Sequence, residues 1–111
     1  MRSDNEMSEK TKQKRILLVD DDANVLAVIS DLLKSTGYAV YEASDAQEAT
    51  RVVKEEFIDL ALIDLRMPGT DGIDLMLSLK KMKLHLRVII YSGYPSINTA
   101  IDALKKGADN Y

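Results

Sequence analysis

The stretch ILLVDDD, residues 16–22, decides the fold, because four consecutive large apolar residues run directly into three aspartates. A continuous apolar run of this length is typical of a strand that is buried on both faces, as in a parallel sheet. The run LALID at residues 60–64 repeats the pattern, and VIIYSG at residues 88–93 ends in a serine instead of an aspartate. The sequence therefore predicts buried parallel strands whose ends carry polar groups.

Helical patterns separate these strands. Apolar residues three and four positions apart predict the inner face of a first helix, at Val25, Val28, Ile29, Leu32 and Leu33. A second helix is predicted to bury Ala46, Ala49, Thr50 and Val53. A third is predicted to carry Ile73, Met76, Leu77 and Lys80, and a fourth to have Ile97, Ala100, Ile101 and Leu104 on one face. Residues 38–43 and 108–111 have the pattern of further strands. Strands that alternate with helices predict an α/β fold with a doubly wound parallel sheet.

The composition limits the possible functions. The chain has 111 residues, enough for one domain, with no cysteine and a net charge of −3. The lack of cysteine excludes disulfides and thiolate metal sites, and the acidic balance argues against nucleic-acid binding by this segment. No apolar run approaches the roughly 18 residues that span a bilayer, and the polar N-terminus does not resemble a signal peptide. We expect a cytoplasmic domain at residues 15–111, preceded by a disordered tail at residues 1–14.

Acidic and hydroxyl side chains follow the predicted strands at one edge of the sheet. Asp20 and Asp21 follow the first strand, Asp64 ends the third and Ser92 follows the fourth. Ligands of doubly wound sheets bind at the carboxyl ends of the strands, so we expect the three carboxylates to converge there. Clustered carboxylates repel one another unless a cation joins them, and Mg²⁺ prefers oxygen ligands. The pattern predicts a Mg²⁺ site with Asp64 as the nucleophile towards a phosphoryl group.

The same residues resemble the receiver domains of response regulators in two-component signalling. The resemblance covers residues 15–111 and rests on VDDD at 19–22, DLRMPGTDG at 64–72, the pair Ser92-Gly93, and Gly107-Ala108 with Tyr111. It implies a CheY-like fold with five parallel strands in the order 2-1-3-4-5. It also implies a phosphoacceptor signalling domain and not an enzyme in the usual sense.

The resemblance further implies a role for each site residue. Asp64 would accept a phosphoryl group from a sensor histidine kinase or phosphotransfer protein. Asp20, Asp21 and Asp64 would hold Mg²⁺ together with the backbone carbonyl of Arg66. Ser92 would turn inward to the phosphoryl group, and Tyr111 would follow it from an exposed to a buried position as a switch.

The conformational change on phosphorylation would control an output domain that this chain does not contain. The stretch SGYPSI at residues 92–97 resembles receivers that precede DNA-binding domains, including the NtrC-like and RegA-like groups. Receivers also carry a lysine shortly after the switch aromatic residue and then a final helix, whereas this chain stops at Tyr111. We therefore expect a truncated receiver with impaired phosphorylation and with a bare apolar sheet face that favours homodimers or other self-association.

Three other functions stay open. A degenerate or truncated receiver would act as a protein-interaction or dimerisation module without phosphorylation. A phosphatase similar to the haloacid dehalogenases also uses a strand-end aspartate, but Arg66 stands where its second aspartate is expected. A flavodoxin-like FMN protein needs a Ser/Thr/Gly-rich phosphate loop after the first strand, where residues 20–22 would repel phosphate.

Some residues have simpler interpretations. His85, the single histidine, is predicted to be a solvated loop residue without a catalytic role. Asp22 is predicted to cap the first helix. Leu26 and Ala27 fall outside the predicted inner face of that helix, and they are candidate contacts for the kinase, with packing as the equal alternative.

Overall fold

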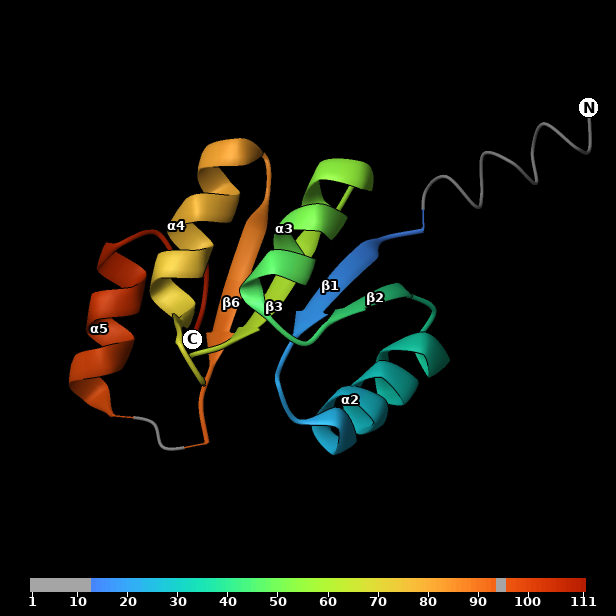
Figure 1. Cartoon of the computed structure of the whole chain (residues 1–111), viewed down its shortest axis with the longest axis horizontal. Helices are drawn as coiled ribbons and strands as arrows, with labels where there is room; N and C mark the ends of the chain where they lie inside the picture. Colours follow the sequence, from blue (N-terminus) through green and yellow to red (C-terminus); the bar gives the residue numbers. More distant parts are fainter. Residues whose placement is uncertain (1–12, 94–95) are drawn as a thin grey trace, which may run out of the picture.

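The computed structural model describes residues 13–93 and 96–111 and shows a parallel sheet between helices (Figure 1). Its strands are β1 (Arg15–Val19), β2 (Ala39–Ala43), β3 (Leu60–Asp64) and β6 (Arg87–Tyr91), and a small hairpin consists of β4 (Arg66–Met67) and β5 (Thr70–Asp71). The helices are α2 (Ala23–Ser35), α3 (Ala46–Glu55), α4 (Gly72–Met82) and α5 (Ile97–Lys105). The predicted tail lies outside the described residues except for Gln13 and Lys14.

The sheet has the predicted order, with one difference at its edge. Four parallel strands lie in the order β2-β1-β3-β6. The predicted fifth strand is reduced to one parallel bridge between Ile89 and Asn110. Asp109 N–H donates to Val88 O at 2.7 Å, and Ile90 N–H donates to Asn110 O at 3.1 Å. These bonds occupy the fifth position, but so few residues reach β6 that no ladder forms, and the described sheet has four strands instead of five.

The strand register brings the predicted site residues to one edge. Val19 pairs with Ile63, so the residues that follow β1 and β3 leave the sheet side by side. Asp64 in turn pairs with Tyr91 at the end of β6. Parallel strands end at the same edge, and the polar residues after β1, β3 and β6 are therefore neighbours although they lie far apart in sequence.

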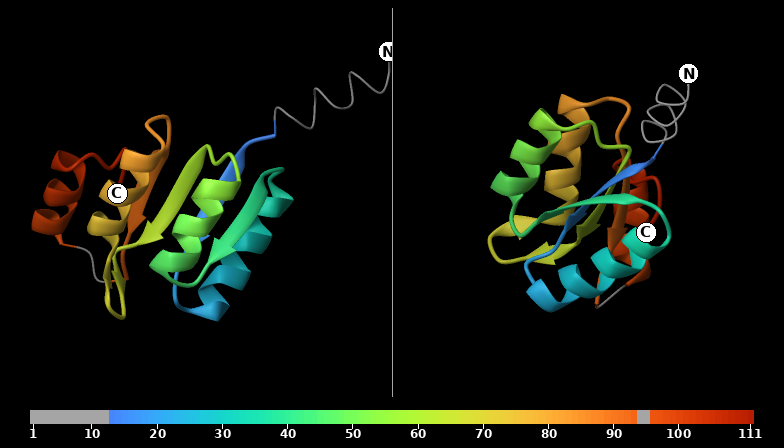
Figure 2. Two further views of the ribbon diagram at one scale, coloured as in Figure 1. Left: turned by 45° about the horizontal axis from the view of Figure 1, so that its top comes forward. Right: turned by 90° about the vertical axis from the view of Figure 1, so that its right-hand side faces the viewer.

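The two faces of the sheet are covered unequally. Helices α3 and α4 lie side by side on one face, α2 lies on the other, and α5 lies beyond β6 (Figure 2). The main core lies under α3 and α4 and includes Leu17, Val19, Ile63, Val88, Ile90, Met76 and Leu79. On the opposite face α2 packs mainly over β2 and β1. Leu60, Leu62 and Ile89 of β3 and β6 consequently stay partly exposed.

The predicted inner face of α2 is partly wrong. Val28 and Leu32 are 68% and 63% exposed, whereas Leu26 is only 8% exposed and Ser30 is buried. The apolar residues of this helix occupy a wide arc, and only the part above β1 and β2 finds a partner. Leu26 is therefore a packing residue, which is the second of the two roles predicted for it, while Ala27 is exposed.

The structure also decides which residues of α4 and α5 are buried. In α4, Gly72, Ile73, Leu75, Met76 and Leu79 are buried, whereas Leu77 is exposed. In α5, Ala103 is buried, and Ile97, Ile101 and Leu104 of the predicted apolar face are exposed. Ala103 belongs to the main core, so α5 reaches the core through this small side chain. The prediction for α3 is confirmed at Ala49 and Val53.

Aspartates begin three of the helices. Asp22 Oδ1 accepts from Asn24 N–H at 2.9 Å and caps α2, which confirms the predicted role of this residue. Asp45 caps α3 and Asp71 caps α4 in the same way. Each cap satisfies backbone donors that the helix itself leaves unpaired. Within the described part of the chain, no helix is long and apolar enough to cross a membrane.

Candidate metal centre

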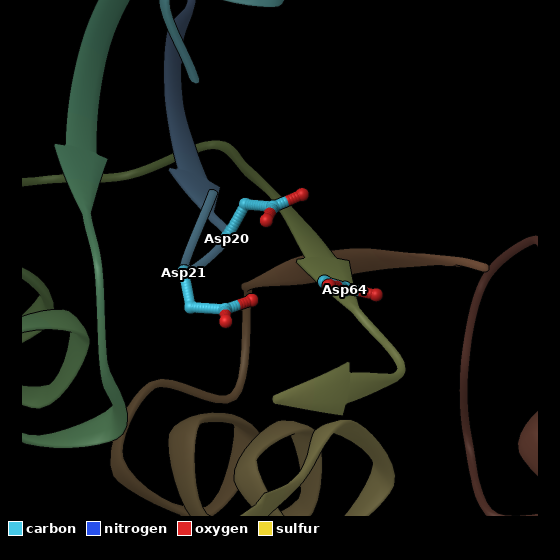
Figure 3. A group of neighbouring side chains, drawn as sticks. All are labelled: Asp20, Asp21 and Asp64. Atoms are coloured by element: carbon cyan, nitrogen blue, oxygen red, sulfur yellow. The ribbon is translucent and has the colours of Figure 1, made fainter. Parts of the chain in front are cut away.

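The structure brings Asp20, Asp21 and Asp64 together. Each offers one carboxylate oxygen, and these three oxygens all lie within 4.8 Å of one another. The carboxylates of Asp20 and Asp21 extend from the end of β1 towards Asp64 at the end of β3 (Figure 3). The convergence that the sequence predicts is therefore present, and it arises directly from the register of β1 and β3.

Asp20 is the most enclosed of the three. Its side chain is only 3% exposed, and both of its carboxylate oxygens accept hydrogen bonds. Asp22 N–H donates to Oδ1 at 2.8 Å, and the hydroxyl of Tyr91 donates to Oδ2 at 2.5 Å. The neighbouring Asp21 is exposed. The pair therefore combines one carboxylate held in place with one that is open to solvent.

Asp64 lies half-buried between these residues and the β4–β5 hairpin. Burial raises the pKa of Asp64, the hydrogen bond from Arg66 N–H lowers it, and the charges of Asp20 and Asp21 raise it further, so that the pKa lies above its ordinary value. The Arg66 N–H group donates to Asp64 Oδ1 at 3.3 Å. Without a cation, the cluster thus brings like charges together in a partly desolvated place.

The donor set fits a hard divalent cation. The cluster supplies carboxylate oxygens, which Mg²⁺ and Ca²⁺ prefer, and a pocket of about 460 Å³ opens beside it. The pocket is lined by Asp20, Asp21, Asp22, Val25, Ile29, Asp64, Tyr91, Ser92 and Gly93. An acidic cluster with an open side can hold a cation and still leave room for the oxygens of a ligand.

The other predicted site residues lie in different surroundings. Ser92 is half-buried and lines the acidic pocket with Asp64. Tyr111 packs against the main core, and its buried hydroxyl has no hydrogen-bond partner in the described part of the chain. This is an inward position of the predicted switch residue. Arg66 is exposed and pairs with Asp71 in the hairpin, while a role of its carbonyl as a ligand stays a prediction.

Gly72 determines how closely the hairpin and α4 approach Asp64. A Cβ atom on Gly72 would lie 2.5 Å from the carbonyl oxygen of Asp64 and 2.8 Å from Cα of Leu65. The N–H group of Gly72 donates to Leu65 O at 2.8 Å. Only glycine fits this approach, which gives a physical reason for the Asp-Gly pair in the motif at residues 64–72.

Tyr91 also belongs to the site, although the sequence pattern does not predict a role for it. Its hydroxyl reaches Asp20 Oδ2 at 2.5 Å and Val19 O at 3.4 Å. Burial, the hydrogen bond to Asp20 and the charges of Asp20, Asp64 and Asp21 all raise the pKa of Tyr91. The phenol therefore stays protonated and can donate. The one available signal was its place at the end of β6, opposite Asp64.

His85 has no part in this cluster. Its ring stacks on Phe57 with 4.4 Å between the ring centroids, and its Nε2 atom lies 3.2 Å from Ile58 O. It is an exposed residue of the loop before β6, as predicted, and it does not line the acidic pocket.

Comparison with known proteins gives a consistent result. The family model of the response regulator receiver domain matches residues 16–111. The alginate biosynthesis transcriptional regulatory protein AlgB of Pseudomonas aeruginosa is 35% identical over 90% of this chain and 22% of its own length. The transcriptional regulatory protein ZraR of Klebsiella oxytoca is 38% identical over 90% of this chain and 23% of its own length. The chain thus spans less than a quarter of these relatives.

Solved structures agree with these matches. A CheY-like receiver domain from Methanospirillum hungatei is 35% identical, with a TM-score of 0.83 over 90% of this chain and 80% of that one. A response regulator from Burkholderia pseudomallei, whose crystal structure is described with a phosphorylated aspartic acid, calcium ion and citrate, is 32% identical. Its TM-score is 0.84, over 89% of this chain and 58% of that one. From its fold, its acidic strand ends and these matches, the chain belongs to the response regulator receiver domains of two-component systems.

Proposed function

We propose that this domain accepts a phosphoryl group on Asp64 in a Mg²⁺-dependent reaction. The observation that carries the proposal is the convergence of three carboxylate oxygens within 4.8 Å, one of them from the half-buried Asp64. Asp20, Asp21 and Asp64, with the carbonyl of Arg66, would hold the cation. The crystal structure from Burkholderia pseudomallei supports this proposal, since it is described with a phosphorylated aspartic acid and a calcium ion.

The chemistry follows from the arrangement of the carboxylates. A carboxylate oxygen of Asp64 attacks phosphorus in line with the leaving group, and the bond from phosphorus to the donor nitrogen or oxygen breaks. The product is an acyl phosphate on Asp64, and the donor leaves with the electron pair. Mg²⁺ at this site supplies the positive charge that lets an anionic donor approach carboxylates. Burial of Asp20 keeps one ligand in place during the transfer.

Ser92 and Tyr111 are proposed to transmit the new charge. Ser92 lines the pocket beside Asp64, within the region that the phosphoryl oxygens would occupy. Tyr111 lies on the segment after α5, and this segment bonds to β6 through Asp109 and Asn110. A movement of Ser92 at the end of β6 would therefore change the place available to Tyr111.

We infer the partners from the family and its relatives. A sensor histidine kinase or phosphotransfer protein would donate the phosphoryl group, and the domain would act in the cytoplasm. The relatives AlgB and ZraR are transcriptional regulators, which supports a DNA-binding output domain. The exposed residues Ala27 and Val28 on α2 are candidate contacts for the kinase.

Phosphorylation is tested with a small donor. The chain is incubated with Mg²⁺ and acetyl phosphate, and intact-mass spectrometry should show one added phosphoryl group. Asp64→Ala should abolish the adduct, and removal of Mg²⁺ by EDTA should do the same. Asp31→Ala on the exposed side of α2 serves as a control and should retain the adduct. An equal adduct on Asp64→Ala would contradict the proposal, and so would the absence of an adduct on the folded wild type both in this chain and in a chain that continues past Tyr111.

A second candidate is a receiver that acts as an interaction module without phosphorylation. The observation in its favour is an open groove of about 720 Å³ on the sheet face that α2 leaves uncovered. Leu33, Tyr38, Phe57, Leu60, Leu62 and Ile89 line it among others. Binding of a partner or second copy with wild-type strength by Asp64→Ala, together with no adduct on the wild type, would favour this candidate.

A further inference from the structure

We propose that Tyr91 is a positioning residue whose hydroxyl fixes the Asp20 carboxylate for cation binding. The inference deepens the proposed function and rests on it, because it concerns the same Mg²⁺ site. Tyr91 itself would not contact the cation. It would act through Asp20, by holding one oxygen of that carboxylate in a single direction.

Among the described residues, two hydrogen bonds hold the Asp20 carboxylate, and only the one from Tyr91 comes from a distant part of the chain. The bond from Asp22 N–H to Asp20 Oδ1, at 2.8 Å, is local and spans two residues. The bond from the Tyr91 hydroxyl to Asp20 Oδ2, at 2.5 Å, joins residues that are 71 positions apart. In the sheet order, β3 lies between β1 and β6, so the Tyr91 side chain reaches across the strand that carries Asp64. Two donors on two oxygens leave the Asp20 carboxylate little freedom to rotate.

Tyr91 is itself held beside Asp64. Its backbone pairs with Asp64 in the ladder between β3 and β6, and its carbonyl accepts from Leu65 N–H at 2.8 Å. One residue therefore bonds to the strand end of Asp64 through its backbone and to Asp20 through its side chain. This double attachment sets the separation of two predicted ligands that belong to different strands.

The expected effect follows from the behaviour of carboxylate ligands. Loss of a hydrogen-bond donor that orients a metal ligand typically weakens metal affinity about 10- to 100-fold. Asp20 is 3% exposed, so solvent cannot readily replace the phenol as the donor to Oδ2. The neighbouring Asp21 is exposed and can be hydrated instead. Removal of the Tyr91 hydroxyl should therefore act mainly on Asp20.

The test measures Mg²⁺ binding without any phosphodonor. Isothermal titration of the wild-type chain and of Tyr91→Phe should show about 10-fold weaker binding by the variant. Tyr41→Phe is the matched control, because it deletes the same hydroxyl from a half-buried tyrosine of β2 that packs on the core and does not line the acidic pocket. Its affinity should equal that of the wild type. Circular dichroism verifies that each variant is folded.

A double-mutant comparison shows whether Tyr91 acts through Asp20. In the Asp20→Asn background, Tyr91→Phe should change Mg²⁺ affinity by less than about twofold, because the oriented carboxylate is already gone. The amide proton of Asp22 gives an independent signal by NMR. Since that amide donates to Asp20 Oδ1, its resonance should shift in Tyr91→Phe and stay unchanged in Tyr41→Phe.

The outcomes separate this inference from the function on which it rests. Clear Mg²⁺ binding by the wild type with equal affinity in Tyr91→Phe would overturn the role of Tyr91 alone. A tenfold loss that persists in the Asp20→Asn background would overturn action through Asp20. No Mg²⁺ binding by the folded wild-type chain would overturn both this inference and the proposed function.

Discussion

At the scale of single residues, the acidic cluster attracts a cation, but repulsion among its carboxylates lowers the stability of the protein when no cation is bound. Asp20, Asp21 and Asp64 converge although each carries negative charge, and burial and repulsion hold the pKa of Asp64 above its ordinary value. Such a site stays unfavourable until a cation neutralises it. The cost arises from the same proximity that would make the site useful.

Asp64→Asn should therefore stabilise the chain in EDTA. Removal of one charge from the cluster relieves repulsion by roughly 1 kcal/mol, the value for unit charges several ångströms apart in a water-like medium, because Asp21 and part of Asp64 are open to solvent. Urea unfolding at neutral pH measures the gain, and added Mg²⁺ should stabilise the variant less than the wild type. Asp31→Asn, which removes a charge from the exposed side of α2, is the control and should have little effect. A less stable Asp64→Asn variant would contradict this account.

At the scale of elements, the β4–β5 hairpin and the start of α4 support Asp64 from one side. Gly72 permits this contact because a side chain there would meet the backbone of Asp64 and Leu65. Away from the site, the outer side of β6 depends on Asp109, whose Oδ2 atom accepts from Val88 N–H at 2.7 Å and from Lys80 Nζ at 2.9 Å. The hairpin and residues 108–111 are thus both short irregular segments instead of long ladders.

Gly72→Ala should be strongly destabilising. The new methyl group overlaps backbone atoms that cannot rotate away, and such overpacking costs about 3 kcal/mol, at the upper end of the usual range. Urea unfolding measures the loss. Gly93→Ala is the matched control, because a Cβ atom on Gly93 would meet nothing within 4 Å. Equal stability of the two variants would show that the backbone at Gly72 moves freely.

The attachment of residues 108–111 should weaken in acid. Burial raises the pKa of Asp109, but the bonds from Lys80 and Val88 N–H and the charges of Lys80 and Arg87 outweigh it, so the pKa lies below its ordinary value. The stabilisation is therefore present above the unfolded pKa, about 3.9, and is lost as pH falls through the lower folded value.

Asp109→Asn tests this dependence. The variant should be less stable than the wild type at neutral pH, by about 1 kcal/mol for the lost charge-assisted bonds. Urea unfolding between neutral pH and pH of about 3 should show the two stabilities converging as Asp109 is protonated. If the difference in unfolding free energy between the two proteins stayed constant across this pH range, the charge of Asp109 would not contribute to stability.

At the scale of the whole molecule, the sheet is complete on one face and open on the other. Helices α3 and α4 cover the main core, whereas α2 leaves β3 and β6 partly exposed. The resulting groove joins Leu33 of α2 to Leu62 and Ile89 of the sheet, with Phe57 and His85 at its border. An apolar surface of this kind favours contact with another apolar surface.

We predict that the chain self-associates through this groove. Light scattering should show an average mass that rises with concentration. Phe57→Glu should lower it, because a charge at the groove opposes burial. Leu84→Glu is the control: Leu84 is 92% exposed and does not line the groove. A constant monomer mass over a wide concentration range would contradict the prediction.

The amino-acid sequence by itself determined the alternation of strands and helices and the acidic strand ends. Continuous apolar runs of four or five residues between helical patterns are typical of buried strands, and strands that run in parallel bring Asp20, Asp21 and Asp64 to one edge. The order of the strands was available from resemblance, and the cap at Asp22 from its place before a helix.

Only the tertiary structure decided which helix faces are buried and how Asp20 is held. Periodicity locates apolar residues around a helix, but the sheet decides which arc is covered, so Leu26 is buried while Val28 is exposed. The bond between Tyr91 and Asp20 depends on the register of three strands across 71 residues. Local sequence patterns cannot predict this hydrogen bond, because its two residues meet only after the strands have paired.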